Sequence, residues 1–261
     1  MENITDLVLP IIKKTREILL PHWGKVENVK YKDGQAHSVV TELDKKVEKF
    51  LYGELNKVFP DIVFVGEEFG GDRTARKFWL ADPIDGTSHF VRGLPFCTTM
   101  LALIEDGQVI FSAIYDFIND VMYHAERGKG AYKNGLPIQV SNRSSGKIYL
   151  AWETHHDKPE NKKIEDELHK FASHFELVCS GYEHAMVAEG KIEGRVCFDH
   201  WGEDYDYAPG ALLISEAGGI VTNIGKTSYN YKDYRFIAAS PIVYKKLTEG
   251  SDAIFPLIIG G

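Results

Sequence analysis

Two closely spaced aspartates carry the strongest chemical signal in the sequence. Asp82 and Asp85, separated by Pro-Ile, end an apolar run and precede the turn former Gly86 and a Gly-Thr pair. Two such carboxylates can hold one cation or bridge two, and hard oxygen ligands suit Mg²⁺ or Mn²⁺ better than zinc. A lone Asp-Gly pair would indicate only a turn, but this combination favours a metal site.

The residues that follow could bind an anion. Gly86, Thr87 and Ser88 offer successive backbone N–H groups, in a turn or at the start of a helix, to the oxygens of a phosphate. The chain as a whole is acidic, with a formal net charge of -8, and would repel a phosphate ester. Bound divalent cations would reverse the local charge and attract the ester.

Acidic residues also follow or begin other expected elements. Glu67 and Glu68 come directly after a short apolar run that is expected to form a strand. Asp206 begins an apolar helix that ends at a double glycine. Taken alone, the first pair would be a solvated turn and Asp206 a helix cap, so these residues gain weight only beside the aspartate pair.

Two helices are expected ahead of the first strand. Residues 4–20 carry apolar side chains at roughly helical spacing, with Pro10 able to kink the element. The second helix begins after Thr41, which could cap it, and ends at Pro60. Its expected buried face consists of Val47, Phe50, Leu51, Leu55 and Val58.

Strands are expected next. Ile62–Val65 and Phe78–Ala81 are short apolar runs, each followed at once by acidic residues, and such strand ends are common places for a site. From Thr98 to Val140, alternating apolar residues are interrupted by Asp-Gly, Arg-Gly-Lys-Gly and Asn-Gly. This pattern predicts a meander of antiparallel strands.

A serine-rich stretch near residue 145 marks an expected boundary. Residues 1–145 are predicted to form an α+β half that carries most candidate metal ligands, and residues 146–261 an α/β half that supplies Asp206 and the substrate contacts. Strands are expected beyond the boundary at Ile148–Trp152, Leu177–Cys179, Arg195–Phe198 and Phe236–Ala239, and helices at Lys163–Phe175, Glu183–Ala188 and Asp206–Ala217.

Composition excludes several classes of protein. The 261 residues, 44% hydrophobic and 26% charged, are typical of a soluble globular chain that can bury a substantial core. The negative charge, without a basic block, argues against nucleic-acid binding, and no apolar run is long enough to span a membrane. Three scattered cysteines predict neither disulfides nor a zinc site, so the cytoplasm is the expected compartment.

Taken together, these segments resemble the inositol monophosphatase family of metal-dependent phosphatases. The resemblance runs from Val40-Thr-Glu-Leu-Asp44 to the Gly218-Gly219 turn and includes the expected hairpin Arg127–Gly135. It implies an αβαβα layered sandwich, a homodimer, and hydrolysis of a small phosphorylated metabolite by metal-activated water. It also implies Mg²⁺ as the cofactor, about two or three ions, with Mn²⁺ as an alternative and Li⁺ as an inhibitor.

The resemblance implies the metal ligands and the catalytic groups. The implied ligands are the carboxylates of Glu67, Asp82, Asp85 and Asp206 and the main-chain carbonyl of Ile84. Glu67, together with Thr87 hydrogen-bonded to Asp44, would orient and deprotonate the attacking water. Nothing in the sequence indicates a covalent phosphate acceptor with a paired acid, so metal-activated water is the simpler route.

The resemblance also implies how the substrate binds. The phosphate would lie on the backbone amides of Gly86, Thr87 and Ser88. Asp199 falls where the family often has a substrate-contacting acid, and Glu183 is a second acidic neighbour. Such acids suit the hydroxyls of a polyol, an ammonium group or an imidazole.

The sequence leaves two substrates open, inositol phosphate and histidinol phosphate. Tyr205 and His89 stand where the family commonly has Trp and Asn, and residues 180–185 lack its run of small residues. Three segments look most like the histidinol-phosphate phosphatase branch of the family: Gly-Glu-Glu-Phe-Gly-Gly, Phe90–Pro95 and Val187–Gly190. These departures remove no metal ligand, but they bear on substrate choice.

Two other functions have to be weighed. A bisphosphatase would need extra basic residues for its second phosphate, for which Lys32, Arg92 and Lys129 are candidates. The chain could also be a catalytically silent regulator that binds metal and phosphate. Such a protein would not require the complete acidic set, so the presence of that set argues against this function. His155-His156 is expected in a solvated loop rather than at a metal.

Overall fold

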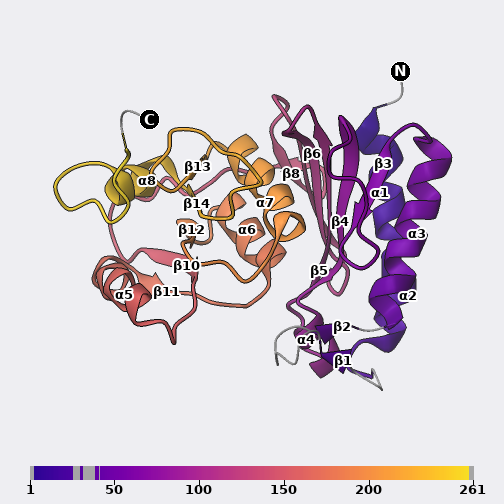
Figure 1. Ribbon diagram of the computed structural model, residues 1–261, viewed down its shortest axis with the longest axis horizontal. Helices are drawn as coiled ribbons and strands as arrows, with labels where there is room; N and C mark the ends of the chain where they lie inside the picture. Colours follow the sequence, from indigo (N-terminus) through magenta and orange to yellow (C-terminus); the bar gives the residue numbers. More distant parts are fainter. Residues whose placement is uncertain (1–2, 26–29, 32–38, 41, 259–261) are drawn as a thin grey trace.

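The chain forms alternating layers of helices and sheets (Figure 1). The computed structural model describes residues 3–25, 30–31, 39–40 and 42–258. A seven-stranded sheet has the order β3-β4-β5-β6-β7-β8-β9, and a five-stranded sheet has the order β11-β10-β12-β14-β13. Helices lie on the outer face of each sheet and between the two. This arrangement confirms the expected αβαβα layered sandwich.

The first helical layer covers the outer face of the seven-stranded sheet. It contains α1 (Ile4–Lys13), α2 (Thr15–Leu19), the 3₁₀ turn η1 (Leu20–His22) and α3 (Glu42–Val58). The helix α1 continues through Pro10 and ends at Lys13. Val58 was wrongly assigned to the buried face of α3, because it is 40% exposed at the helix end. The expected cap Thr41 lies outside the described residues.

The seven-stranded sheet confirms the expected meander. Its first two strands run parallel and all later neighbours antiparallel. The strands are β3 (Val63–Gly66), β4 (Lys77–Asp85), β5 (Thr98–Glu105), β6 (Gln108–Asp116), β7 (Val121–Glu126), β8 (Ala131–Lys133) and β9 (Leu136–Pro137). The short helix α4 (Thr87–Arg92) follows β4, and the two-residue strands β1 (Lys30–Tyr31) and β2 (Val39–Val40) pair with each other.

An irregularity in β4 decides where its aspartates point. In a regular strand, residues three apart face opposite sides of the sheet. Here Asp82 pairs with Met100 and Asp85 with Thr98, so three steps along β4 match two along β5. This mismatch is a β-bulge, and the extra residue turns Asp85 back to the side of Asp82. Both carboxylates therefore face the central helices.

The second part of the chain builds the central helices, the five-stranded sheet and the outer helices. Its helices α6 and α7 lie between the sheets, whereas α5 and α8 cover the far face of the five-stranded sheet (Figure 1). The elements are β10 (Tyr149–Glu153), α5 (Pro159–Phe171), β11 (Ser173–His174), α6 (Ser180–Ala188), β12 (Gly194–Cys197), α7 (Asp204–Glu216), β13 (Ile220–Asn223), β14 (Phe236–Ala239) and α8 (Pro241–Thr248).

One hydrophobic core joins the two sheets. Leu212 of α7 packs in the same cluster as Leu80 of β4 and Phe236 of β14. The division at residue 145 stays a prediction, since this core is continuous across it. Among the described residues, no helix combines the length and the apolar character needed to cross a bilayer.

Two expected elements were placed incorrectly. The helix predicted at Lys163–Phe175 lies at Pro159–Phe171, because Pro159 is well suited to the first helical turn. The strand predicted at Leu177–Cys179 is wrong: residues 175–179 form a loop that leads into α6, and the short strand precedes it. Strand β13 and helix α8 were not predicted.

Candidate active site

A cavity of about 180 Å³ opens where β4, α4, α6 and α7 meet. Glu67, Asp82, Asp85 and Asp206 line it, and we call this group the acidic side. A second group of lining residues, which we call the leaving-group side, consists of Trp152, Glu153, Glu176, Glu183, Arg195 and Trp201. Asp82 and Asp85 come from one half of the chain and Asp206 from the other, so the cavity depends on how the two sheets are packed together.

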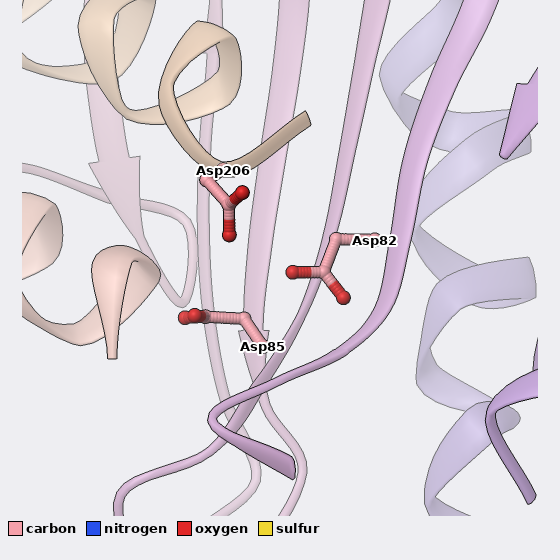
Figure 2. A group of neighbouring side chains, drawn as sticks. All are labelled: Asp82, Asp85 and Asp206. Carbon is pink, nitrogen blue, oxygen red and sulfur yellow. The ribbon is translucent and has the colours of Figure 1, made fainter. Parts of the chain in front are cut away.

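Three aspartates converge on the acidic side. One carboxylate oxygen each of Asp82, Asp85 and Asp206 lies within 4.8 Å of the others. Figure 2 shows the two β4 side chains and that of α7 directed toward a common space. Asp82 and Asp85 are only 2% and 5% exposed. The structure thus brings together three of the ligands that the sequence suggested, and Glu67 lines the same cavity from the loop after β3.

Two of these carboxylates are oriented by nearby backbone amides. The Ile84 N–H donates to Asp82 Oδ1 at 3.0 Å. The Glu203 N–H donates to Asp206 Oδ2 at 2.7 Å, within the capping box that begins α7. Asp206 is therefore a helix-capping residue and a member of the cluster at once. Each carboxylate retains one oxygen that these backbone bonds do not use.

Asp85 is held by the first turn of α6. Its carboxylate accepts hydrogen bonds from the Ser180 and Gly181 N–H groups at 3.0 and 2.7 Å. The Thr98 hydroxyl and the Cys179 thiol also donate to it, both at 3.0 Å. These bonds fix the orientation of the Asp85 side chain against the start of α6. No local motif in the sequence had indicated these partners.

The electrostatics of the cluster favour a bound cation. Burial raises the pKa of Asp82 well above its ordinary value, and the charges of Glu67, Asp85 and Asp206 raise it further. Burial, followed by the charges of Asp85 and Glu67, likewise raises the pKa of Asp206. A divalent cation would remove this mutual repulsion. Because all the side-chain donors are carboxylate oxygens, the residues fit Mg²⁺ or Mn²⁺.

Thr87 lies close to Asp44 and to the main chain of Ile84. Its hydroxyl oxygen is 2.7 Å from the Ile84 carbonyl and 3.4 Å from Asp44 Oδ1. A hydroxyl has one proton and donates to one acceptor at a time, so the Ile84 carbonyl is the closer partner. Asp44, on α3, is buried. The expected pair of Thr87 and Asp44 is therefore within reach, across a long contact.

The implied phosphate site begins at Gly86. Gly86, Thr87 and Ser88 line the cavity at the start of α4. The backbone of Gly86 is left-handed, with φ of 80°, and a Cβ here would lie 2.6 Å from the Phe96 carbonyl oxygen. Glycine is therefore required for the turn that presents these three amides.

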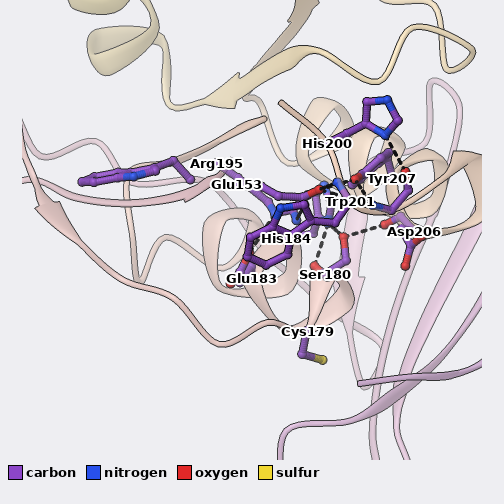
Figure 3. A network of polar contacts seen from close by, with 12 residues as sticks. Glu153, Cys179, Ser180, Glu183, His184, Arg195, His200, Trp201, Asp206 and Tyr207 are labelled. Carbon is purple, nitrogen blue, oxygen red and sulfur yellow. Dashed lines mark hydrogen bonds and ion pairs between the residues drawn. The ribbon is translucent and has the colours of Figure 1, made fainter. Parts of the chain in front are cut away.

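The leaving-group side contains an ion-pair network (Figure 3). Arg195 Nη2 lies 2.6 Å from a Glu153 carboxylate oxygen, and Arg195 Nε lies 2.8 Å from one of Glu183. The second Glu183 oxygen accepts from the Leu177 N–H at 2.8 Å. Burial raises the pKa of Glu183, whereas Arg195 lowers it. Both Glu183 oxygens thus have protein partners, and its substrate contact stays a prediction.

Asp199 is turned toward α5. Its carboxylate is 2.8 Å from Lys158 Nζ and 2.7 Å from Asn161 Nδ2. It is not among the residues that line the cavity. These partners account for the position of Asp199 without a ligand, and the substrate contact implied by the resemblance stays a prediction.

We expect Asp199→Asn to change KM by less than about threefold, because the carboxylate pairs with Lys158 and Asn161 and does not line the cavity. Steady-state kinetics at low and high ionic strength would measure it. A tenfold rise in KM that shrinks at high salt would instead show that this carboxylate binds a cationic substrate.

Comparison with known proteins agrees with this geometry. The model of the inositol monophosphatase family matches residues 1–254. A fructose-1,6-bisphosphatase/inositol-1-monophosphatase of Thermotoga maritima is 30% identical over 94% of each chain. A histidinol-phosphatase of Chlorobaculum parvum is 31% identical over 82% of this chain and 83% of its own.

The fold comparison leads to the same family. A structure of the extragenic suppressor protein suhB from Bartonella henselae superposes with a TM-score of 0.84 at 27% identity, over 94% of this chain and 96% of that one. The acidic cluster consists of oxygen donors that could hold the metal ion of such a phosphatase. The chain therefore belongs to the inositol monophosphatase family and is a metal-dependent phosphomonoesterase.

Proposed function

We propose that the chain hydrolyses the phosphate monoester of a small metabolite with Mg²⁺ as cofactor. The observation that carries the proposal is the convergence of Asp82, Asp85 and Asp206 in one cavity with the amides that begin α4. When bound, Mg²⁺ supplies Lewis-acid stabilisation of phosphate oxygens and lowers the pKa of water. The proposed ligands are Glu67, Asp82, Asp85, Asp206 and the Ile84 carbonyl.

The protein's own groups would orient the reactants. The amides of Gly86, Thr87 and Ser88 would hold the phosphate oxygens at the start of α4. Glu67 and the Thr87 hydroxyl, backed by Asp44, would orient the attacking water and accept its proton. The Ile84 carbonyl has two lone pairs, so it can accept from Thr87 and still offer one to a cation.

The leaving-group side favours a cationic amino alcohol over a neutral polyol. Glu153 and Glu183 are both paired with Arg195, whereas Glu176 has one polar contact within the described part of the chain, at 3.8 Å from His156 Nε2. The carboxylate of Glu176 is 33% exposed and lines the cavity with two tryptophans. A part-exposed carboxylate that lines the cavity suits an ammonium or imidazolium group, with which it can form a charge-assisted hydrogen bond. The relatives include a histidinol-phosphatase and several inositol monophosphatases, so this choice rests on Glu176.

A bisphosphate fits this cavity less well. Arg195 is the one basic residue among the described residues that line it, and two of its nitrogens are engaged by Glu153 and Glu183. Of the earlier candidates, Lys129 pairs with Glu126 and Arg92 donates to the Ser88 carbonyl, and neither lines the cavity. The third candidate, Lys32, lies outside the described residues.

A substrate panel tests the proposal. We expect phosphate release from histidinol phosphate with a kcat/KM at least about tenfold above that for inositol phosphate, because a charge-assisted hydrogen bond contributes about 1.5–3 kcal/mol. Glu176→Gln should reduce this advantage about tenfold, through KM. The matched control is Glu160→Gln, at an exposed position of α5 outside the cavity.

Three outcomes are informative. If Glu176→Gln lowers kcat/KM equally for both esters, Glu176 does not select for the charge of the substrate. A preference for inositol phosphate would assign the site to a polyol. Mg²⁺ and phosphate binding without release of phosphate from any ester would support the silent regulator instead.

We further propose that the protein is a homodimer in the cytoplasm. All three cysteines are free and buried, which fits a reducing compartment. Light scattering of the purified protein would test the dimer.

A further inference from the structure

The segment that carries Glu67 is anchored on both sides of the cavity. We define the Glu67 loop as residues 67–73, which connect β3 to the approach of β4. Its first amide, Glu67 N–H, donates to the Ala81 carbonyl beside Asp82 at 3.1 Å. A pair of backbone hydrogen bonds between Gly66 and Gly70, at 3.0 and 3.1 Å, closes the turn. The loop is therefore a defined turn against β4.

The first side-chain anchor is Glu48 of α3. One of its carboxylate oxygens accepts from the Glu68 N–H at 2.7 Å, and the other accepts from the Phe69 N–H at 2.9 Å. Glu48 is 1% exposed. A Cβ at residue 66 would lie 2.0 Å from its Oε1, so Gly66 allows this close approach. A buried carboxylate on the helix thus holds the two amides next to Glu67.

The same face of α3 serves a second wall of the site. Asp44 lies one helical turn before Glu48, so the two side chains share a face. Asp44 contacts the Thr87 hydroxyl, whereas Glu48 holds the Glu67 loop. Burial, the largest effect, raises the pKa of Glu48, and the two backbone bonds lower it. A buried carboxylate is costly unless it is hydrogen-bonded, so Glu48 depends on its two amide partners. The Glu67 loop is thereby tied to α3.

The second anchor joins the loop to the helix that carries Asp206. Arg73 forms a bidentate ion pair with Asp204, with Nε–Oδ2 at 2.8 Å and Nη2–Oδ1 at 3.2 Å. The Asp204 side chain is 4% exposed and belongs to the first residue of α7. Asp204 stands two positions before Asp206, although Arg73 belongs to the other half of the chain. The pair therefore links the two walls that supply Glu67 and Asp206.

We propose that Glu48 and Arg73 are positioning residues for metal binding, which act by setting Glu67 against the Asp82, Asp85 and Asp206 cluster. The inference rests on the proposed function, because it requires Glu67 to be a ligand. Neither residue lines the cavity. Residues that orient metal ligands in this way commonly change metal affinity about 10- to 100-fold when they are replaced.

The variants are chosen to separate positioning from general stability. Glu48→Gln keeps the shape of the side chain but presents an NH₂ group to one of the two backbone donors. Arg73→Gln removes the bidentate pair, and Arg73→Lys keeps the charge without the fork geometry. The matched control is Arg76→Gln, because Arg76 forms a similar bidentate pair with Asp106, at 2.9 and 3.1 Å, that is exposed to solvent.

The measurement is calorimetric titration of each metal-free protein with Mn²⁺ alone, together with its unfolding temperature. We expect Glu48→Gln and Arg73→Gln to weaken Mn²⁺ binding about 10- to 100-fold, Arg73→Lys to recover part of the loss, and Arg76→Gln to bind as wild type. Asp204→Asn should weaken binding as Arg73→Gln does, and the double variant should lose little more, because the two residues act as one pair.

The possible results separate this inference from the proposed function. Lower unfolding temperatures with unchanged Mn²⁺ affinity in Glu48→Gln and Arg73→Gln would overturn the inference and leave the phosphatase proposal intact. An equal loss of Mn²⁺ affinity in Arg76→Gln would also overturn the inference, since the pair of Arg76 and Asp106 is remote from the cluster. Failure of the wild type to bind Mn²⁺ would overturn both.

Discussion

Asp82→Asn and Asp206→Asn will each lower kcat by about 10³-fold or more, and each will raise the unfolding temperature of the metal-free protein. The loss follows because metal-borne charge stabilisation is worth several kcal/mol and each 1.36 kcal/mol is a factor of ten in rate. The fold should survive, because the oxygen of the introduced amide can still accept from the Ile84 or Glu203 N–H.

The gain in stability follows from the direction of the pKa shifts. Burial and neighbouring acids raise the folded-state pKa of Asp82 and Asp206 above the ordinary value of 3.8. A carboxyl group of this kind stabilises the fold fully below its unfolded pKa, and this contribution is lost as the pH rises through the raised folded pKa. In the metal-free protein at neutral pH, the burial and mutual repulsion of these carboxyl groups therefore lower the stability of the fold, and an asparagine relieves this cost.

Thermal unfolding in EDTA, followed from acidic to neutral pH, will measure this effect. The wild type should lose stability as the pH rises and regain it on addition of Mg²⁺, whereas the variants should respond less to both. Asp106→Asn, which changes an exposed aspartate paired with Arg76, is the control and should behave as wild type in rate and in response to metal. A wild-type rate in either variant would place the metal site elsewhere, and outright unfolding would assign that aspartate a structural role.

Removal of the metal will abolish turnover. EDTA-treated protein should release no phosphate above background, and Mg²⁺ or Mn²⁺ should restore the rate, because the cluster consists of carboxylate oxygens suited to these ions. Ca²⁺ should bind but support little turnover, since its larger and looser coordination relaxes the geometry. Full activity in EDTA would contradict the metal-dependent mechanism.

The metal requirement should also depend on pH. The ligands must lose their protons to bind a cation, and the pKa values of Asp82 and Asp206 are raised in the metal-free protein. The Mg²⁺ concentration that gives half-maximal activity should therefore rise as the pH falls. A concentration that stays constant from neutral to acidic pH would show that these carboxyl groups do not ionise on binding.

Local patterns were enough to predict most of the elements. The alternation from Thr98 to Val140 and its glycine turns determine the meander, because strand periodicity and turn chemistry act within a few residues. The positions of Asp82, Asp85 and Asp206 near element ends were likewise visible, since one apolar run stops before the first two and another starts after Asp206. The same local rules misplaced the strand before α6, because the Leu177 N–H donates to the Glu183 side chain of α6 and not to a neighbouring strand.

The geometry of the site was decided by tertiary structure. The bulge that turns Asp85 toward Asp82 depends on the register with β5, which spacing along one strand cannot specify. The α6 amides that hold Asp85 lie 95 and 96 residues away along the chain, and Asp204 lies 131 residues from Arg73. Such partners meet only when both sheets pack on the central helices.

The acidic residues themselves show the same division. The sequence alone determined that the chain carries enough carboxylates for a metal site, because their number and spacing are covalent facts. Only the fold decided that Asp82 and Asp206 face a cavity while Asp199 pairs with α5 and Glu48 is buried beneath a loop. The physical reason is that burial and pairing set the role of a carboxylate, and both come from residues that are distant in sequence.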